Sequence, residues 1–262
     1  MVFGYKQKWY PIMLGLAVFS AIFLIATCSH AADITLPGLK LEMGGANDAG
    51  DLATGIKILL LLTILALAPA ILITVTAFIR IVVVLAFLRQ ALGTQQTPPT
   101  QVLIALALFL TAFVMAPTMG KANQQGLQPY LAGKLAAEPA IEKIARPFKT
   151  FMLSQTREAD LALFIDLSGG KIPKTREDVP WTSLLPAFVI SELKTAFQMG
   201  FLLFLPFLLI DMIVGAILMS MGMMMVPPMM LSLPFKILLF VLADGWHLVV
   251  QSLINSFYGG GP

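Results

Sequence analysis

Long apolar runs alternate with shorter polar blocks along this chain of 262 residues. Apolar stretches of about 20 residues are long enough to cross a bilayer as helices. The pattern therefore predicts an all-α polytopic membrane protein with long bent helix hairpins and a small polar helical domain between them. We expect six segments: a cleavable signal peptide (1–31), a flexible periplasmic lead (32–55), a first apolar helix hairpin (56–118), a polar helical domain (119–182), a second apolar helix hairpin with a methionine-rich loop (183–258) and a tail (259–262).

The first segment has the features of a secretory signal peptide. Two lysines precede a continuous apolar stretch at 11–27, and Ser29 and Ala31 place small residues before a cleavage site. This arrangement predicts cleavage after Ala31. Two alternatives stay open. One is an uncleaved signal anchor, because the stretch is just long enough to span a bilayer, and the other is a lipoprotein acylated on Cys28.

The distribution of lysine and arginine predicts the orientation of the chain. The short loop at 89–101 contains Arg89, follows Arg80 and has no acidic residue, which is typical of a cytoplasmic loop. The block at 119–182 carries both signs of charge, and a block of this length can be translocated whatever its charge. We therefore expect this block in the periplasm, outside a bacterial inner membrane that is crossed by four apolar segments.

Apolar residues at helical spacing predict two helices in the polar block, at 140–153 and 159–167. Gly169 and Gly170 end the second helix, and the sequence KIPKTREDVP that follows predicts a loop. A domain of about 60 residues buries little hydrophobic core. We therefore expect it to pack on a copy of itself or on a neighbouring chain.

The composition excludes several classes of function. Only 12% of the residues are charged, whereas a soluble domain carries about 25%. The net charge of +3 is small and no basic stretch is interleaved with aromatics, so nucleic acid is not an expected partner. The single cysteine, Cys28, and the widely separated His30 and His247 cannot build a Cys/His zinc site. With no phosphate-binding loop either, we expect no cofactor, no metal and no catalytic residue.

Two apolar runs are longer than membrane spans require. Residues 56–88 and 184–218 would each measure about 50 Å as one helix, whereas the hydrocarbon core of a bilayer is about 30 Å thick. Pro69 and Pro206 can kink these runs. Even so, much of this apolar surface must contact protein rather than lipid.

Several charged residues lie within the apolar runs, where a charge normally faces a bundle interior or water. Asp211 and Lys236 flank the methionine-rich loop, so an antiparallel hairpin brings them within about one helical turn of each other. We predict an ion pair or a shared polar network between their helices. The alternative is that each contacts a backbone group or another chain. Nearer the ends of the runs, we expect Lys57, Glu192 and Lys194 to extend toward the membrane interface.

Asp244 and His247 form a further candidate polar site. They stand three residues apart, which places them on one face of a helix. Such a pair can serve a proton relay, although it is more often a structural contact.

Residues 219–230 contain seven methionines in twelve positions, and Gly222 and Pro227-Pro228 prevent a continuous helix there. Methionine side chains are flexible and repack readily. A ring of such loops from several subunits would form a soft apolar constriction that excludes ions when empty. The alternative is gap-filling at a helix turn. The candidate pore gasket consists of Met219, Met221, Met223, Met224 and Met225.

Three stretches are similar to the FliP family of flagellar export-gate proteins, which has relatives in injectisomes. They are FIRIVVVLAFLRQALGTQQTPPTQVL at 78–103, PAFVISELKTAFQMGFLLFLPFLLIDMIVG at 186–215 and LPFKILLFVLADGW at 233–246. The resemblance covers essentially all of residues 50–258. It implies bent helix hairpins packed against neighbouring subunits, in an assembly lifted largely toward the periplasm, which accounts for the long runs and the charges within them.

The resemblance also implies a function. Several copies of the chain are expected to assemble with FliQ and FliR into a channel at the flagellar basal body, through which unfolded flagellar proteins are exported. FlhB, FlhA and the MS ring are expected as further partners. The family's methionine gasket corresponds to Met223, Met224 and Met225, and its charged pair corresponds to Asp211 and Lys236.

Three other functions stay open at this point. An injectisome subunit would share the family features, but the signal peptide and the match at RQALGTQQTPP favour the flagellar assignment. A small-molecule or ion transporter would explain broken helices, but the two halves show no repeat. An intramembrane enzyme has few reactive groups available, namely Ser191, Glu192, Asp211, Asp244 and His247. No serine stands in a recognisable nucleophile turn, so we do not expect an enzyme.

Overall fold

The computed structural model describes residues 49–94, 96–169, 173, 175–223 and 226–259. The signal peptide with its cleavage after Ala31, most of the lead, and Met224 and Met225 lie outside the described residues. Every element assigned within them is a helix: α2 (Ala49–Thr74), α3 (Phe78–Ala91), α4 (Thr100–Ala122), the π-helical segment η1 (Asn123–Leu127), α5 (Gln128–Leu131), α6 (Ala137–Gln155), α7 (Glu158–Leu167), the 3-10 turn η2 (Arg176–Asp178), α8 (Trp181–Ser220), α9 (Pro228–Leu242) and α10 (Gly245–Tyr258).

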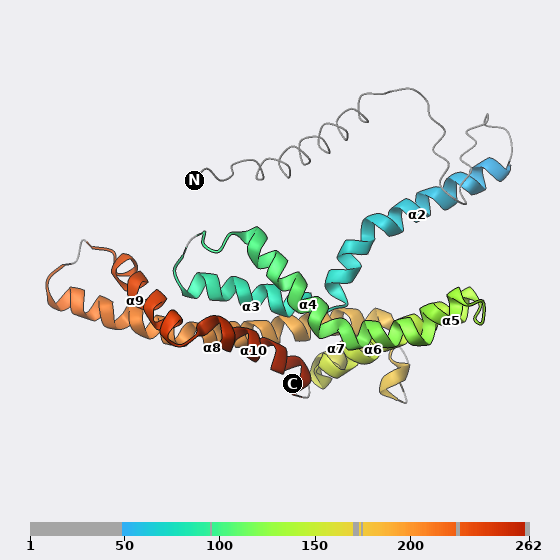
Figure 1. Cartoon of the computed structure of the whole chain (residues 1–262). Helices are drawn as coiled ribbons and strands as arrows, with labels where there is room; N and C mark the ends of the chain where they lie inside the picture. The colour runs from blue at the N-terminus through green and yellow to red at the C-terminus, as the bar shows by residue number, and fades with distance from the viewer. Residues whose placement is uncertain (1–48, 95, 170–172, 174, 224–225, 260–262) are drawn as a thin grey trace, which may run out of the picture. The chain divides into compact units, whose positions relative to one another are not determined.

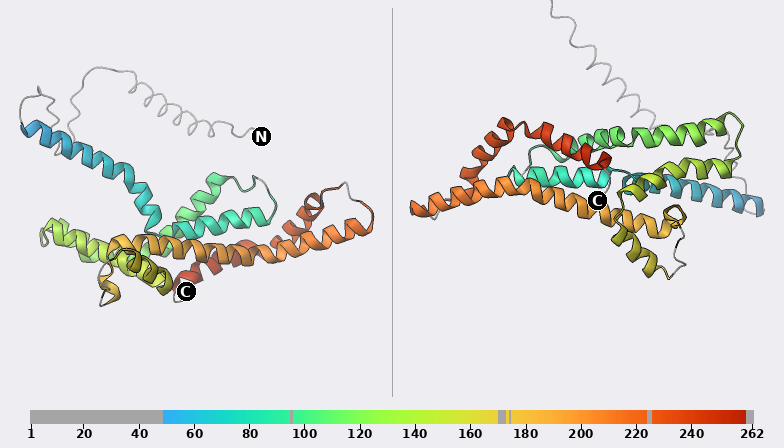
Figure 2. Two further views of the ribbon diagram at one scale, coloured as in Figure 1. Left: turned by 180° about the vertical axis from the view of Figure 1, so that it is seen from behind. Right: turned by 90° about the horizontal axis from the view of Figure 1, so that it is seen from below.

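The chain divides into two compact units, at 1–61 and 62–262, and α2 extends across the division. The packing described below is that of the second unit (Figures 1 and 2). Among the described residues, two helical segments are long and apolar enough to cross a membrane, Thr100–Leu131 and Trp181–Ser220. The bent pair of α9 and α10 adds a third if it counts as one span. The all-α polytopic membrane fold is therefore confirmed.

The first apolar run is broken rather than continuous. α2 runs through Pro69 to Thr74, and α3 begins only at Phe78. The Thr74 hydroxyl donates to carbonyl groups about one turn earlier, at 3.0 Å, and the backbone N–H of Phe78 donates to Thr76 Oγ1 at 3.4 Å. Such local hydrogen bonds compete with the helical ladder. The break therefore falls at the threonines and not at the proline, where the sequence suggested a kink.

α4, η1 and α5 form one helical segment, Thr100–Leu131, which continues past the end of the predicted first hairpin. Pro129 has no backbone N–H to donate, and the wider π turn in η1 directly precedes it and accommodates the missing hydrogen bond. Gly126 lies against α6, where an added Cβ would come within 2.5 Å of Ile144 Cγ1. The missing side chain lets α6 pack directly on this segment.

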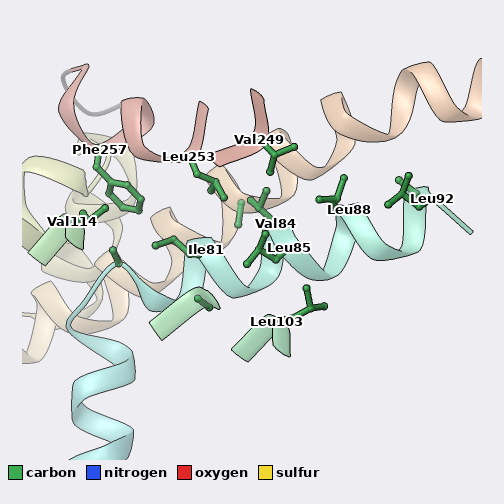
Figure 3. Close-up of a cluster of buried hydrophobic side chains, with 14 of the residues drawn as sticks. Ile81, Val84, Leu85, Leu88, Leu92, Leu103, Val114, Val249, Leu253 and Phe257 are labelled. Atoms are coloured by element: carbon green, nitrogen blue, oxygen red, sulfur yellow. The ribbon is translucent and has the colours of Figure 1, made fainter. Parts of the chain in front are cut away.

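The main hydrophobic core surrounds α3 (Figure 3). α3 contributes Ile81, Val84, Leu85 and Leu88. The buried side chains around them are Leu103 and Val114 of α4, Ala196 and Phe207 of α8, and Val249, Leu253 and Phe257 of α10. Because α3 contacts three other helices, its sequence is apolar on most sides and shows no amphipathic pattern.

A smaller core holds the polar domain against the first turns of α8. Its buried members are Met152 and Leu153 of α6, Leu161 of α7, Val179, and Leu184, Ala187 and Phe188 of α8. α6 and α7 coincide with the helices predicted at 140–153 and 159–167. The polar domain thus packs on the start of α8 of its own chain, which supplies an apolar face. Contact with a second copy or a neighbouring chain stays a prediction.

The distal half of α8 and the whole of α9 leave large apolar side chains uncovered. Those more than half exposed include Phe201, Leu209, Met212 and Ile213 of α8, and Phe235, Leu238 and Val241 of α9. Contiguous apolar surface of this extent marks contact with lipid or with other protein chains. The hairpin formed by α8 and α9 therefore has the surface of a membrane-embedded subunit.

Candidate functional site

The described members of the predicted gasket, Met219, Met221 and Met223, lie where α8 turns into α9 (Figure 1). α8 ends at Ser220, and Gly222 adopts a φ of +74°, a left-handed conformation that glycine tolerates without steric cost. Pro227 precedes α9 and Pro228 is its first residue, a position where proline loses no hydrogen bond. Glycine and proline therefore set the loop, as the sequence predicts.

The methionines that the structure describes at this turn are exposed. Met219 in the last turn of α8 and Met221 after it are 64% and 67% exposed, and Met223 is 42% exposed. Sequence reasoning left out two neighbours, Met229 and Met230, which are 61% and 72% exposed in the first turn of α9. Flexible thioether side chains thus form an apolar surface at the end of the hairpin, where another chain can contact them.

A polar cluster, here called the Lys236 network, joins the two helices of the hairpin. Lys236 Nζ lies 2.6 Å from Asp211 Oδ2, so the ion pair predicted from the sequence is present in the structure. The Ser232 hydroxyl donates to Asp211 Oδ1 at 2.5 Å, and Lys236 Nζ also donates to the carbonyl of Ala91 at 3.2 Å. That carbonyl ends α3, where the helix dipole favours a cation. Sequence reasoning found the ion pair but neither Ser232 nor Ala91.

A second polar cluster, here called the Arg80 network, lies in the main core. Arg80 and Glu192 are both fully buried, and the guanidinium forms a bidentate ion pair with the carboxylate, with Nε donating to Oε2 at 2.9 Å. The remaining N–H groups donate to the Ser256 carbonyl at 3.1 Å, the Ser256 hydroxyl at 3.0 Å and Gln155 Oε1 at 3.1 Å. The guanidinium carbon lies 4.0 Å from the centre of the Phe257 ring. Arg80 thereby connects α3, α6, α8 and α10.

Two sequence-based interpretations are corrected by this cluster. Glu192 was expected to extend toward the interface, but α8 begins at Trp181, so Glu192 stands three turns inside the helix and faces α3. Arg80 was counted among the charges beside the cytoplasmic loop, but its side chain is buried in the core. Lys194 is exposed, as expected of a surface lysine.

Asp244 and His247 both stand at the start of α10. Asp244 stands at the break between α9 and α10 with φ 49° and ψ 51°, in the left-handed region, and α10 begins only at Gly245. An added Cβ at Gly245 would lie 2.2 Å from the Phe240 ring, which accounts for glycine at this tight bend. Both Asp244 and His247 are exposed. Asp244 is the N-cap residue of α10 and His247 lies in the first turn of that helix, so their proton-relay role stays a prediction.

No group of three or more His, Cys, Asp or Glu side chains comes together in the part of the chain that the structure describes. The arrangement of the site is instead mechanical. An apolar, methionine-lined turn stands at the end of a hairpin, the Lys236 network ties that hairpin to α3, and the Arg80 network ties α3 to three further helices.

Comparison with known proteins identifies the family. Residues 61–253 match the FliP family. The chain is 54% identical to the flagellar biosynthetic protein FliP of Bacillus subtilis (strain 168) over 83% of this chain and 98% of that protein. It is 57% identical to the FliP protein of Cereibacter sphaeroides over 78% and 68% of the two chains, and 49% identical to that of Caulobacter vibrioides over 93% and 91%. The chain therefore belongs to the FliP family.

Proposed function

We propose that this chain forms, with FliQ and FliR, the gated channel of the flagellar type III export apparatus. As a member of the FliP family it is a component of that apparatus. In the proposed assembly, several copies surround a central passage for unfolded flagellar proteins. FlhB, FlhA and the MS ring are its proposed neighbours in the bacterial inner membrane, with the polar domain in the periplasm.

One observation carries the proposal. The exposed methionines lie at the end of a hairpin whose flanks are also apolar and uncovered, so the flanks can pack against neighbouring subunits while the ends converge. A converging ring of thioether side chains closes to an apolar constriction that repels water and ions. Because methionine has three rotatable bonds and no fixed shape preference, the same ring deforms around polypeptides of different sequence.

The test is to replace Met223, Met224 and Met225 together with alanine in the assembled export apparatus. Alanine removes the flexible side chains that close the constriction, so we expect ions to leak across the membrane at rest. Secretion of flagellin should persist at least in part, because the passage itself stays in place. Membrane potential and secreted flagellin are measured in the same cells.

Met212→Ala is the matched control, because Met212 is 65% exposed on α8 but lies before the loop. It should leave the membrane tight. A tight membrane in the triple variant would contradict the proposal, as would loss of uptake of one small molecule without any general leak, which a transporter predicts.

A further inference from the structure

The hairpin formed by α8 and α9 has a structural joint on its α9 side. α9 and α10 meet at an angle of 65° across two residues, Ala243 and Asp244. Among the described residues, Asp244 is the non-glycine residue with a positive φ. This conformation is costly for a residue that has a Cβ. Its own side chain makes no capping hydrogen bond. The side-chain contact across this bend is aromatic, because the Phe240 ring of α9 lies 5.5 Å from the Trp246 ring of α10, edge to face.

A second weak point lies opposite the first, on α8. Pro206 stands inside this 40-residue helix and cannot donate a hydrogen bond to the preceding turn. The next residue, Phe207, has its ring 6.4 Å from that of Phe240, and the Phe240 ring lies against Gly245. The two helices of the hairpin thus lose regular backbone bonding at the same level, on either side of one aromatic contact.

The parts of the chain on the two sides of this contact, α10 and the end of the hairpin, are anchored to different extents. α10 is fixed by core residues and by the Arg80 network, which binds Ser256 and Phe257. Beyond the joint, the hairpin tip, defined as residues 207–223 and 226–242, buries few side chains, and on α9 these are Ser232, Lys236 and Phe240. The polar contact that the tip makes to α3 is the hydrogen bond from Lys236 Nζ to the Ala91 carbonyl.

Most of the Lys236 network lies within the hairpin tip, which determines what a movement of the tip would break. Asp211, Ser232 and Lys236 all belong to the tip, so their ion pair and hydrogen bonds move with it. Within this network, the bond to Ala91 crosses to the rest of the chain. Phe207 and Phe240 of the tip also pack in the main core. Release of the tip therefore breaks one hydrogen bond of this network and loosens the packing of Phe207 and Phe240. It keeps the lysine neutralised by its carboxylate, so no buried charge is left unpaired.

From this geometry we propose that the hairpin tip swings as one body about a hinge formed by Pro206 and residues 243–245, with the Lys236–Ala91 hydrogen bond as its latch. The proposal rests on the proposed export function, because the swing displaces the methionine turn from the passage. With the latch closed the turn is held in place, and with the latch open it withdraws while α10 stays in the core.

Stiffening and loosening the hinge tests the proposal in the assembled export apparatus. Pro206→Ala restores a helical hydrogen bond, so flagellin secretion should fall at least threefold in complexes that assemble in normal amount. Pro186→Ala is the matched control, because Pro186 lies in the same helix outside the hinge, and it should secrete at the wild-type rate. Asp244→Gly lets this residue adopt both signs of φ at little cost, so the joint becomes less rigid, and the variant should raise the resting ion leak severalfold. Equal secretion by the two proline variants, with no added leak in Asp244→Gly, would overturn the hinge.

A distance measurement follows the motion directly, and decides the matter if Pro206→Ala does not assemble. Spin labels are placed on Val241 in the tip and Leu108 in α4, both exposed, in a Cys28→Ser background with labelled subunits in the minority. The tip distance should broaden in Asp244→Gly, while a control pair on Leu248 of α10 and Leu108 stays unchanged. If the distance distributions of the tip pair and the control pair had equal widths in both proteins, the hinge would be refuted.

A leak in the methionine variant alongside that result would leave the export function standing, whereas a missing leak would reject the function itself.

Discussion

Replacing Arg80 with alanine should prevent accumulation of the folded chain in the membrane. The change leaves Glu192 as a fully buried carboxylate without its partner and removes the donors to Ser256 and Gln155. Removing one partner of a buried ion pair costs about 3–5 kcal/mol, a large part of the ~5–15 kcal/mol that stabilises a typical domain. Protease resistance of the membrane-bound chain and the amount of assembled complex measure the effect.

Two further variants separate burial from charge. Arg146→Ala removes the ion pair with Glu177, whose side chains are 71% and 75% exposed, and exposed pairs of this kind contribute about 0–1 kcal/mol. It should leave the complex intact. Replacing Arg80 and Glu192 together, with methionine and leucine, removes both charges and should recover much of the lost protein. An Arg80→Ala chain that resists protease as well as Arg146→Ala would show that the Arg80 network does not hold the helices together.

Lys236→Met should release the hairpin tip and open the membrane to ions. The substitution keeps the length of the side chain but removes the ion pair to Asp211 and the hydrogen bond to Ala91. Hydrogen bonds to charged groups contribute about 1.5–3 kcal/mol each, so the closed position should lose most of its polar attachment. We expect a resting ion leak and reduced secretion of flagellin, measured as membrane potential and secreted protein.

Lys194→Met provides the control, because Lys194 is an exposed lysine on α8. It should behave as wild type. Asp211→Asn combined with Lys236→Met removes the stranded carboxylate and should assemble better than Lys236→Met alone, yet still leak because the bond to Ala91 is missing. If Lys236→Met kept a tight membrane and normal secretion, the Lys236 network would have no part in closure.

Asp211 and Lys236 could be paired from the sequence because they stand on either side of one loop, where hairpin geometry alone brings them together. Arg80 and Glu192 could not, because 112 residues separate them and their contact depends on the packing of α3 on α8. Periodicity did not help, since α3 contacts several helices and is apolar on most of its faces. The buried pair therefore looked like two unrelated charges near the ends of apolar runs.

The two helix breaks, between α2 and α3 and between α9 and α10, were not predicted, because neither has a glycine or proline at the residue where the helix is interrupted. The division between α2 and α3 lies in a segment without glycine or proline, where threonine hydroxyls replace the helical bonds. At Asp244 the left-handed residue is an aspartate, so the sequence did not indicate that a new helix begins there. Only the neighbouring Gly245, which leaves room for the Phe240 ring, marks that bend in the sequence.

The Arg80 network also sets an order on biosynthesis. The ribosome makes Arg80 well before its counter-ion, which follows 112 residues later, and before Ser256, which follows 176 residues later. At the usual speed of translation, about 5–20 residues per second, the first interval lasts on the order of ten seconds. Throughout that time the nascent helix α3 carries an unneutralised cation, which hydrocarbon does not accept cheaply. We therefore expect α3 to enter its final position only after the second half of the chain emerges.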